Sequence, residues 1–196
     1  MTVILRPVSA AVAASLLLAS CASIASVPAG PVSVGSAQAQ LGREWSDITL
    51  LTPDRSKKVK LLTIDGPLLN RLYISDGLAP GDYIVRASAK ERPTPTIRSG
   101  MSASERMEFV ADSLAAGGLL RVETSRPAPA TIDGHAGVRF DISAKSAEGL
   151  DIAGVAVAVQ AGDKTYVAIF VAPAEHYFAA LLPEAERVFS SLKLKS

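Results

Sequence analysis

The side chains best suited to acid–base chemistry in this chain are its two histidines, His135 and His176. His135 follows an Asp133-Gly134 turn and could exchange protons with Asp133 or Asp141 as a general acid and base. His176 lies in a Glu-His-Tyr stretch near the start of an expected helix, and the H-x-x-x-H spacing of a helical metal site is absent. We interpret the two as a turn histidine and a helix-surface histidine, and we predict no catalytic residue and no metal ligand.

Other enzyme motifs are missing from the sequence. There is no G-x-S-x-G nucleophile elbow, no phosphate-binding P-loop and no G-x-G-x-x-G turn. A single cysteine, Cys21, cannot form a zinc knuckle. The formal net charge of +1 gives no electrostatic reason to expect nucleic acid. The sequence therefore predicts a protein without cofactor or enzymatic activity, and a hydrolase using His135 or His176 is the weakest alternative.

The first twenty residues have the three parts of an export signal. One basic residue, Arg6, precedes the apolar run of residues 8–18, and small residues follow. The sequence Leu18-Ala19-Ser20-Cys21 resembles the lipobox of bacterial lipoprotein precursors. This resemblance implies cleavage before Cys21 and attachment of diacylglycerol to its sulfur. Ala22, in place of aspartate, favours sorting to the outer membrane.

Two other interpretations of the N-terminus stay open. The apolar run could be retained as an anchor, although it is shorter than the roughly 20 apolar residues of a membrane-spanning helix. The chain could also be secreted as a soluble protein after cleavage at the A-x-A sequence of residues 37–39. We favour the lipoprotein, anchored at the periplasmic face of the outer membrane.

The predicted domain organisation has three parts: a signal peptide over residues 1–20, a lipidated tether over 21–43, and a single domain over 44–196. The tether is rich in Ala, Ser, Gly, Pro, Val and Gln, a composition typical of flexible linkers. About twenty such residues would span on the order of 25 Å. We therefore expect the domain to begin near Trp45 and to hang near the membrane without lying in it.

The domain pattern predicts an α+β fold with an antiparallel sheet. A helix should begin after Ser102, which forms a capping box with Glu105, and should stop at Gly117. Two further helices are expected after Pro173, the second starting at Pro183. Apolar alternation and turn residues predict strands over residues 48–51, 58–64, 68–74, 83–87, 119–124, 138–142, 150–159 and 165–171.

Two details of the strand pattern carry further expectations. Gly154, Ala156 and Ala158 share one strand face, and their small size would let a helix pack closely. The sequence Thr-Ile-Asp-Gly occurs at residues 63–66 and again at 131–134, each time before a strand. Convergence on good hairpin chemistry is the favoured explanation, and duplication of half the domain is the alternative.

Residues 119–194 resemble the PsbP-like domains, named after an extrinsic photosystem protein. The resemblance rests on Gly134, the alternating strand Val138–Ile142, the hairpin at Gly162-Asp163 and the Phe189-Ser190-Ser191 stretch. It implies an antiparallel sheet flanked by helices, in a family of mostly non-enzymatic binding and assembly modules. As a whole, the chain resembles uncharacterised lipoproteins of alphaproteobacteria.

These observations predict a binding or assembly module for another cell-envelope protein. The expected contact is a sheet edge or the proline-containing loop of residues 89–100, with Lys90, Arg92 and Arg98 as candidate partner-binding residues. The alternative is a small-ligand or lipid-binding domain with a cleft between sheet and helices.

Overall fold

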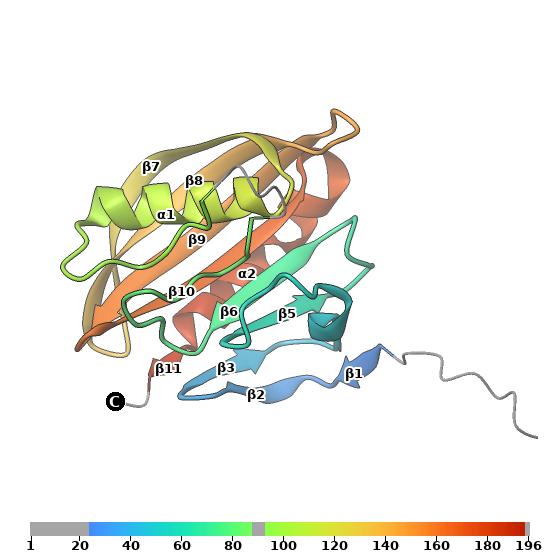
Figure 1. Ribbon diagram of the computed structural model, residues 1–196. Helices are drawn as coiled ribbons and strands as arrows, with labels where there is room; N and C mark the ends of the chain where they lie inside the picture. The colour runs from blue at the N-terminus through green and yellow to red at the C-terminus, as the bar shows by residue number, and fades with distance from the viewer. Residues whose placement is uncertain (1–23, 88–92, 195–196) are drawn as a thin grey trace, which may run out of the picture.

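The computed structural model describes residues 24–87 and 93–194, and these form an α+β domain around one large antiparallel sheet (Figure 1). Its eight strands follow the order β1-β4-β5-β6-β10-β9-β8-β7. Helix α1 covers one face, and helix α2 covers the other together with the three-stranded sheet β11-β3-β2. The predicted fold class is confirmed. In the described residues, neither helix is long and apolar enough to cross a membrane.

The bounds of the elements are β1 (Ala25–Val27), β2 (Gly30–Val34), β3 (Ala37–Leu41), β4 (Trp45–Asp47), η1 (Thr49–Leu51), β5 (Val59–Thr63), β6 (Arg71–Ser75), α1 (Ala103–Ala116), β7 (Leu120–Ile132), β8 (His135–Lys145), β9 (Asp151–Ala161), β10 (Lys164–Pro173), η2 (Ala174–Phe178), α2 (Ala179–Ser190) and β11 (Lys193–Leu194).

Strands β9 and β10 are buried on both faces, because each lies inside the sheet between α1 on one side and α2 with the β2–β3 hairpin on the other. Ala156 and Ala158 of β9 belong to the core beneath α1, together with Val110 of that helix. The expectation that small residues would receive a helix is confirmed. The opposite face of β9, with Val155 and Val157, belongs to the core beneath α2.

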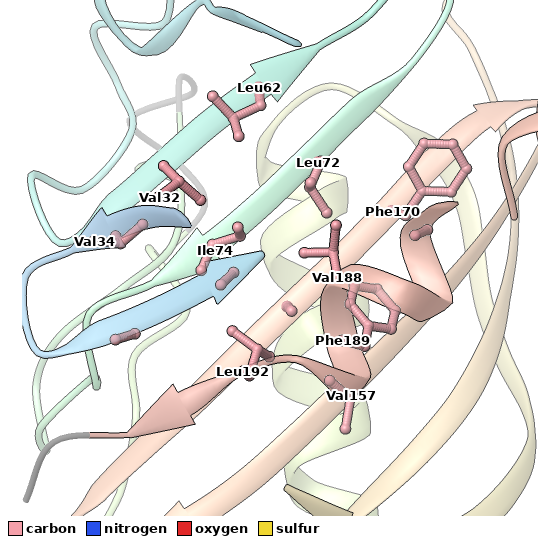
Figure 2. Packing of buried hydrophobic residues seen from close by; sticks show 14 of the residues in the cluster. Val32, Val34, Leu62, Leu72, Ile74, Val157, Phe170, Val188, Phe189 and Leu192 are labelled. Atoms are coloured by element: carbon pink, nitrogen blue, oxygen red, sulfur yellow. The ribbon is translucent and has the colours of Figure 1, made fainter. Parts of the chain in front are cut away.

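The second core joins distant parts of the chain. Figure 2 shows Val188 and Phe189 of α2 packed near Phe170 of β10, with Val32 of β2 on the far side of the same cluster. Backbone contacts reinforce this packing, since the Gly42 amide donates to Glu184 of α2 at 2.7 Å. The amino-terminal strands are therefore part of the domain core.

The predicted tether is wrong for the described part of residues 21–43. β2 and β3 pair in a tight hairpin whose inward side chains are almost fully buried: Val32, Val34, Ala37, Ala39 and Leu41. The segment has the composition of a linker, but its small or aliphatic residues alternate with serine and glutamine, which is the pattern of a strand buried on one face. The domain boundary thus lies before residue 25, not at residue 44. Residues 1–23, which include Cys21, lie outside the described residues.

The hairpin turn is fixed by a polar cluster. The Ser36 hydroxyl donates to Asp76 at 2.7 Å and lies 3.1 Å from the Tyr166 hydroxyl. Gly35 has a φ of 53°, and a side chain there would collide with Asp76. Glycine is therefore required by both the backbone conformation and the close approach of the carboxylate.

Several predicted elements differ in detail. Residues 48–51, expected as a strand, end in the 3-10 helix η1, and residues 83–87 contribute only a bridge between Val85 and Arg55. The two expected carboxy-terminal helices are one helix, α2, preceded by the irregular turn η2. Pro183 is the fifth residue of α2, and its missing amide removes one hydrogen bond of the helix.

The repeated Thr-Ile-Asp-Gly sequences form different turns. Asp133 and Gly134 make a two-residue hairpin turn with φ values of 50° and 81°, as a type I′ turn requires. The first copy leads into a longer connection, in which the Asn70 side chain accepts from the Thr63 hydroxyl at 3.1 Å. This difference favours convergence over duplication.

The amino-terminal hairpin can be tested with neighbouring residues of opposite exposure. Val32→Ala removes two buried methyl groups and should lower the free energy of unfolding by about 1–3 kcal/mol. Ser33→Ala, on the exposed face of the same strand, should change it by less than about 0.5 kcal/mol. Urea unfolding followed by circular dichroism measures both. Equal stability of the two variants would mean that residues 24–43 are a tether after all.

The capping box of α1 gives a second test. The Glu105 amide donates to the Ser102 hydroxyl at 3.2 Å, and the Glu105 carboxylate accepts from the Ser102 amide at 2.8 Å. Ser102→Ala should cost about 1 kcal/mol of unfolding free energy. Ser104→Ala, an exposed position within the helix, should be neutral or slightly stabilising, because alanine favours the helix. A Ser102→Ala variant as stable as Ser104→Ala would contradict the cap.

The same cap has a pH signature. The backbone hydrogen bond from Ser102, followed by its side-chain hydrogen bond, lowers the pKa of Glu105 below its usual 4.5. A carboxyl group whose pKa is lowered by folding stabilises the folded protein at pH values above its usual pKa. This stabilisation is lost as the pH falls through the lowered pKa. Glu105→Ala should therefore destabilise the protein at neutral pH and cease to do so in acid.

Candidate functional site

Of the three basic residues expected to bind a partner, the structure describes only Arg98. Lys90 and Arg92 lie outside the described residues. Arg98 is exposed and forms an ion pair with Glu105 at 3.0 Å, on the rim of the α1 cap. The neighbouring Ile97 is buried and exchanges backbone hydrogen bonds with Gly81 and Asp82. This part of the expected binding loop is thus packed onto the domain, with Arg98 engaged locally.

The two histidines lie at opposite ends of the sheet. His135 begins β8, whose other end, Lys145, pairs with Asp151 of β9 near the turn that contains His176. Ten residue steps along β8 correspond to about 33 Å, so the histidines cannot act on one substrate bond. In the described part of the chain, no three His, Cys, Asp or Glu side chains are grouped as metal ligands.

The carboxylates considered as partners of His135 have other roles. Asp133 accepts hydrogen bonds from the Leu194 amide at 2.9 Å and from the Lys193 ammonium at 3.0 Å. These bonds, the backbone one foremost, lower the pKa of Asp133. Asp141 forms ion pairs with Arg126 and Arg139. Both carboxylates therefore tie structural elements together.

An apolar groove lies at the end of the sheet where β8 meets β9. It has a volume of about 470 Å³ and is formed by the β5–β6 connection, the segment after α1 and the β8–β9 turn. Its lining residues are Leu68, Leu69, Arg71, Gly117, Gly118, Leu119, Ser146, Ala147, Glu148, Leu150 and Ile152. We call this the leucine groove.

The leucine groove has a buried floor and exposed walls. Leu119 and Ile152 are buried beneath it, and Leu69 is half-buried. Leu68 and Leu150, in contrast, are 84% and 56% exposed. Both come from turns, where polar residues usually lie. Large apolar side chains held in solvent around an apolar hollow are typical of binding surfaces.

A second hollow of about 330 Å³ adjoins the leucine groove and shares Leu69 and Leu150 with it. Its far wall is η2, where His176 has φ 65° and ψ −55°. This conformation is a rare, strained γ-turn for a residue with a side chain. Strain of this kind is often concentrated at functional sites. The second hollow thus extends the candidate site toward Tyr177.

Charge is confined to the edges of the leucine groove. Arg71 and Glu148 are its charged lining residues, and Lys145 pairs with Asp151 at 2.7 Å close by. A hydrogen bond from the Ser146 side chain is the main cause of the lowered pKa of Glu148. The groove therefore combines an apolar interior with charged groups that can fix the direction of a bound segment.

The sequence does not reveal this site, because its residues come from three separate turns. The available signal was the presence of leucine beside turn-forming residues, in Pro67-Leu68-Leu69 and in Gly149-Leu150. Nothing in the sequence indicated that these turns meet at one end of the sheet. The strained His176 was likewise expected on the surface of a regular helix.

Comparison with known proteins identifies the fold. No protein-family model matches the sequence, and no curated protein matches it. The solution structure of cyanobacterial PsbP (CyanoP) from Synechocystis sp. PCC 6803 has a TM-score of 0.54 and 13% identity, covering 90% of this chain and 98% of that chain. The Ran-binding protein Mog1p of Saccharomyces cerevisiae has a TM-score of 0.52 and 8% identity, covering 89% and 96%.

These identities are low, so the likeness concerns the fold alone. The similarity covers nearly all of the chain and includes the first half, which the sequence resemblance did not reach. The chain has a PsbP/Mog1-like fold.

Proposed function

We propose that the protein is a lipid-anchored, non-enzymatic binding module of the bacterial cell envelope, which holds an apolar segment of a partner protein in the leucine groove. The observation that carries this proposal is the exposure of Leu68 and Leu150 on either side of a groove of about 470 Å³. Covering two such leucines is favourable by roughly 1.5–3 kcal/mol each. A partner segment would supply that cover.

The chemistry of the groove supports binding over catalysis. Its lining is apolar apart from Ser146 and the charged Arg71 and Glu148. Such a surface gains free energy mainly by excluding water, and the charged groups can orient a bound segment. His135 lies at the other end of the sheet, and the carboxylates considered as its partners, Asp133 and Asp141, are engaged in structural contacts. His176 lines only the adjoining second hollow.

An alternative occupant is a small apolar molecule, such as an acyl chain. The groove volume falls within the roughly 300–1,000 Å³ of small-molecule sites, which favours this possibility. Such sites enclose most of their ligand, however, whereas the walls of the leucine groove project into solvent. A protein segment, which needs only one side covered, fits this shape better.

The proposed location follows from the amino-terminal sequence. Cys21 would carry the lipid, and Ala22 would direct the protein to the periplasmic face of the outer membrane. Two or more acyl chains give stable anchoring. The groove would then be presented to other proteins of the envelope.

Lipidation is tested directly by metabolic labelling. Cells given radioactive palmitate should label the wild-type protein, and Cys21→Ala should abolish the label because the acceptor sulfur is gone. Globomycin, which blocks removal of lipoprotein signal peptides, should cause the precursor to accumulate. An unlabelled wild-type protein that matures normally in globomycin would refute the anchor and leave the groove proposal to its own test.

The groove is tested by photo-crosslinking in intact cells. A photoreactive amino acid at Leu150 should give one dominant crosslinked protein, whereas the same probe at exposed Thr131 should not. Leu68→Ser should reduce the crosslink more than about tenfold, because one leucine contact is lost. Leu68→Met, which keeps the apolar bulk, should retain most of it.

Two results would contradict the proposed partner. A crosslink that is equally strong from Thr131, or unchanged by Leu68→Ser, would place the contact elsewhere. A small molecule that co-purifies with the full-length protein and is lost in Leu68→Ser, as seen by native mass spectrometry, would assign the groove to a ligand.

A further inference from the structure

A second exposed apolar patch lies where the described chain begins. Ile24 is 51% exposed, and Leu50 and Leu51 of η1 are 88% and 48% exposed. β1 pairs antiparallel with β4, and Ala25 lies opposite Asp47. Continued by one residue, this register directs Ile24 toward Ile48, the residue before η1. Figure 1 shows β1, in blue, near the short teal helix. We call these three residues the N-terminal patch.

The leucines of this patch are held firmly in their exposed positions. The Thr49 amide donates to the Asp47 carboxylate at 2.9 Å, and the Thr49 hydroxyl accepts from the Leu61 amide at 3.0 Å. The Arg55 side chain donates to the Thr49 carbonyl at 3.1 Å. Two hydrogen bonds to the sheet and one to the following loop hold this turn in place, so the leucines cannot easily fold inward and their exposure is built into the fold.

The patch is also very close in sequence to the predicted lipid. Three residue steps separate Cys21 from Ile24, and a fully extended chain spans at most about 3.6 Å per step, or roughly 11 Å. A tether of residues 21–43 would have allowed about twice that reach. Because β1 starts at Ala25, the patch must remain near any membrane that holds the lipid.

We propose that Ile24, Leu50 and Leu51 insert into the surface of the membrane that carries the Cys21 lipid, so that the sheet stands on its β1 edge. This proposal rests on the lipid anchor of the proposed function and is independent of the groove. Apolar side chains of peripheral proteins reach about 5–10 Å into the boundary between headgroups and acyl chains.

The opposite edge of the sheet, β7, lies seven strand spacings of about 4.8 Å from β1, or about 34 Å away. Figure 1 shows β1 and β7 at opposite sides of the domain. In this orientation β7 points into the periplasm. The short chain to Cys21 and the patch together fix the orientation, which a single flexible attachment could not do.

Site-directed spin labelling of the purified full-length lipoprotein tests the orientation. Acylation leaves Cys21 without a free thiol, so a label attaches only to a cysteine introduced at Leu50 or, as control, at Thr131 on β7. The protein is reconstituted in vesicles of phosphatidylethanolamine and phosphatidylglycerol. The Leu50→Cys label should lose access to a water-soluble nickel relaxant and gain access to oxygen, whereas the Thr131→Cys label should remain water-accessible.

A second variant tests the contribution of the patch itself. In Leu51→Cys, the label should be shielded from nickel, and adding Leu50→Ser should reduce this shielding because the most exposed apolar side chain of the patch is lost. An acylated protein whose Leu50→Cys and Thr131→Cys labels are equally accessible to nickel would overturn the proposal and keep the anchor. A protein whose intact mass shows no acyl group would overturn both, and the crosslinking result for the groove would stand.

Discussion

Burial of the β9–β10 hairpin on both faces is the constraint on which the rest of the structure depends. The two strands lie in the interior of an eight-stranded sheet and carry apolar or small side chains on either side. Every exposed face of such a pair would cost free energy in water, so both need a cover. Helix α1 supplies one cover, and the small alanines of β9 let it approach closely. The other face has two covers.

That second cover joins the two ends of the described chain. Helix α2 spans part of the face, and the β2–β3 hairpin closes the remainder, with Val32 and Val34 reaching the same core as Phe170 (Figure 2). The short strand β11 pairs with β3 and is held by Asp133 at the tip of the β7–β8 hairpin. The amino-terminal strands are therefore fixed by the core, and β1 begins four residues after Cys21.

The covers do not extend over the end of the sheet where β8 turns into β9. There the leucines of two turns project into solvent around an apolar hollow, and the chain after β10 passes through the strained conformation of His176 before α2 begins. The leucine groove and the N-terminal patch both contain apolar side chains that no helix or strand covers. One exposes apolar surface toward a proposed protein partner, the other toward a proposed membrane.

The sequence by itself determined the elements whose signals are local. The Ser102–Glu105 capping box placed α1, and the Asp133-Gly134 dipeptide placed the β7–β8 turn, because both depend on hydrogen bonds and backbone angles within a few residues. Alternation along β8 and β9 similarly identified the residues that share each face. The resemblance of residues 119–194 to PsbP-like domains implied the antiparallel sheet with flanking helices.

Only the tertiary structure decided that residues 24–41 form strands of the domain, and where the leucine groove lies. A segment of Ala, Val, Ser and Gln has the composition of a linker, and it becomes a strand pair only when a core offers its alternating side a place to pack. The groove likewise depends on three turns that are remote in sequence and meet through the register of the sheet. Local sequence patterns do not predict such long-range contacts, because the free energy that forms these contacts comes from burial of residues that are distant in sequence.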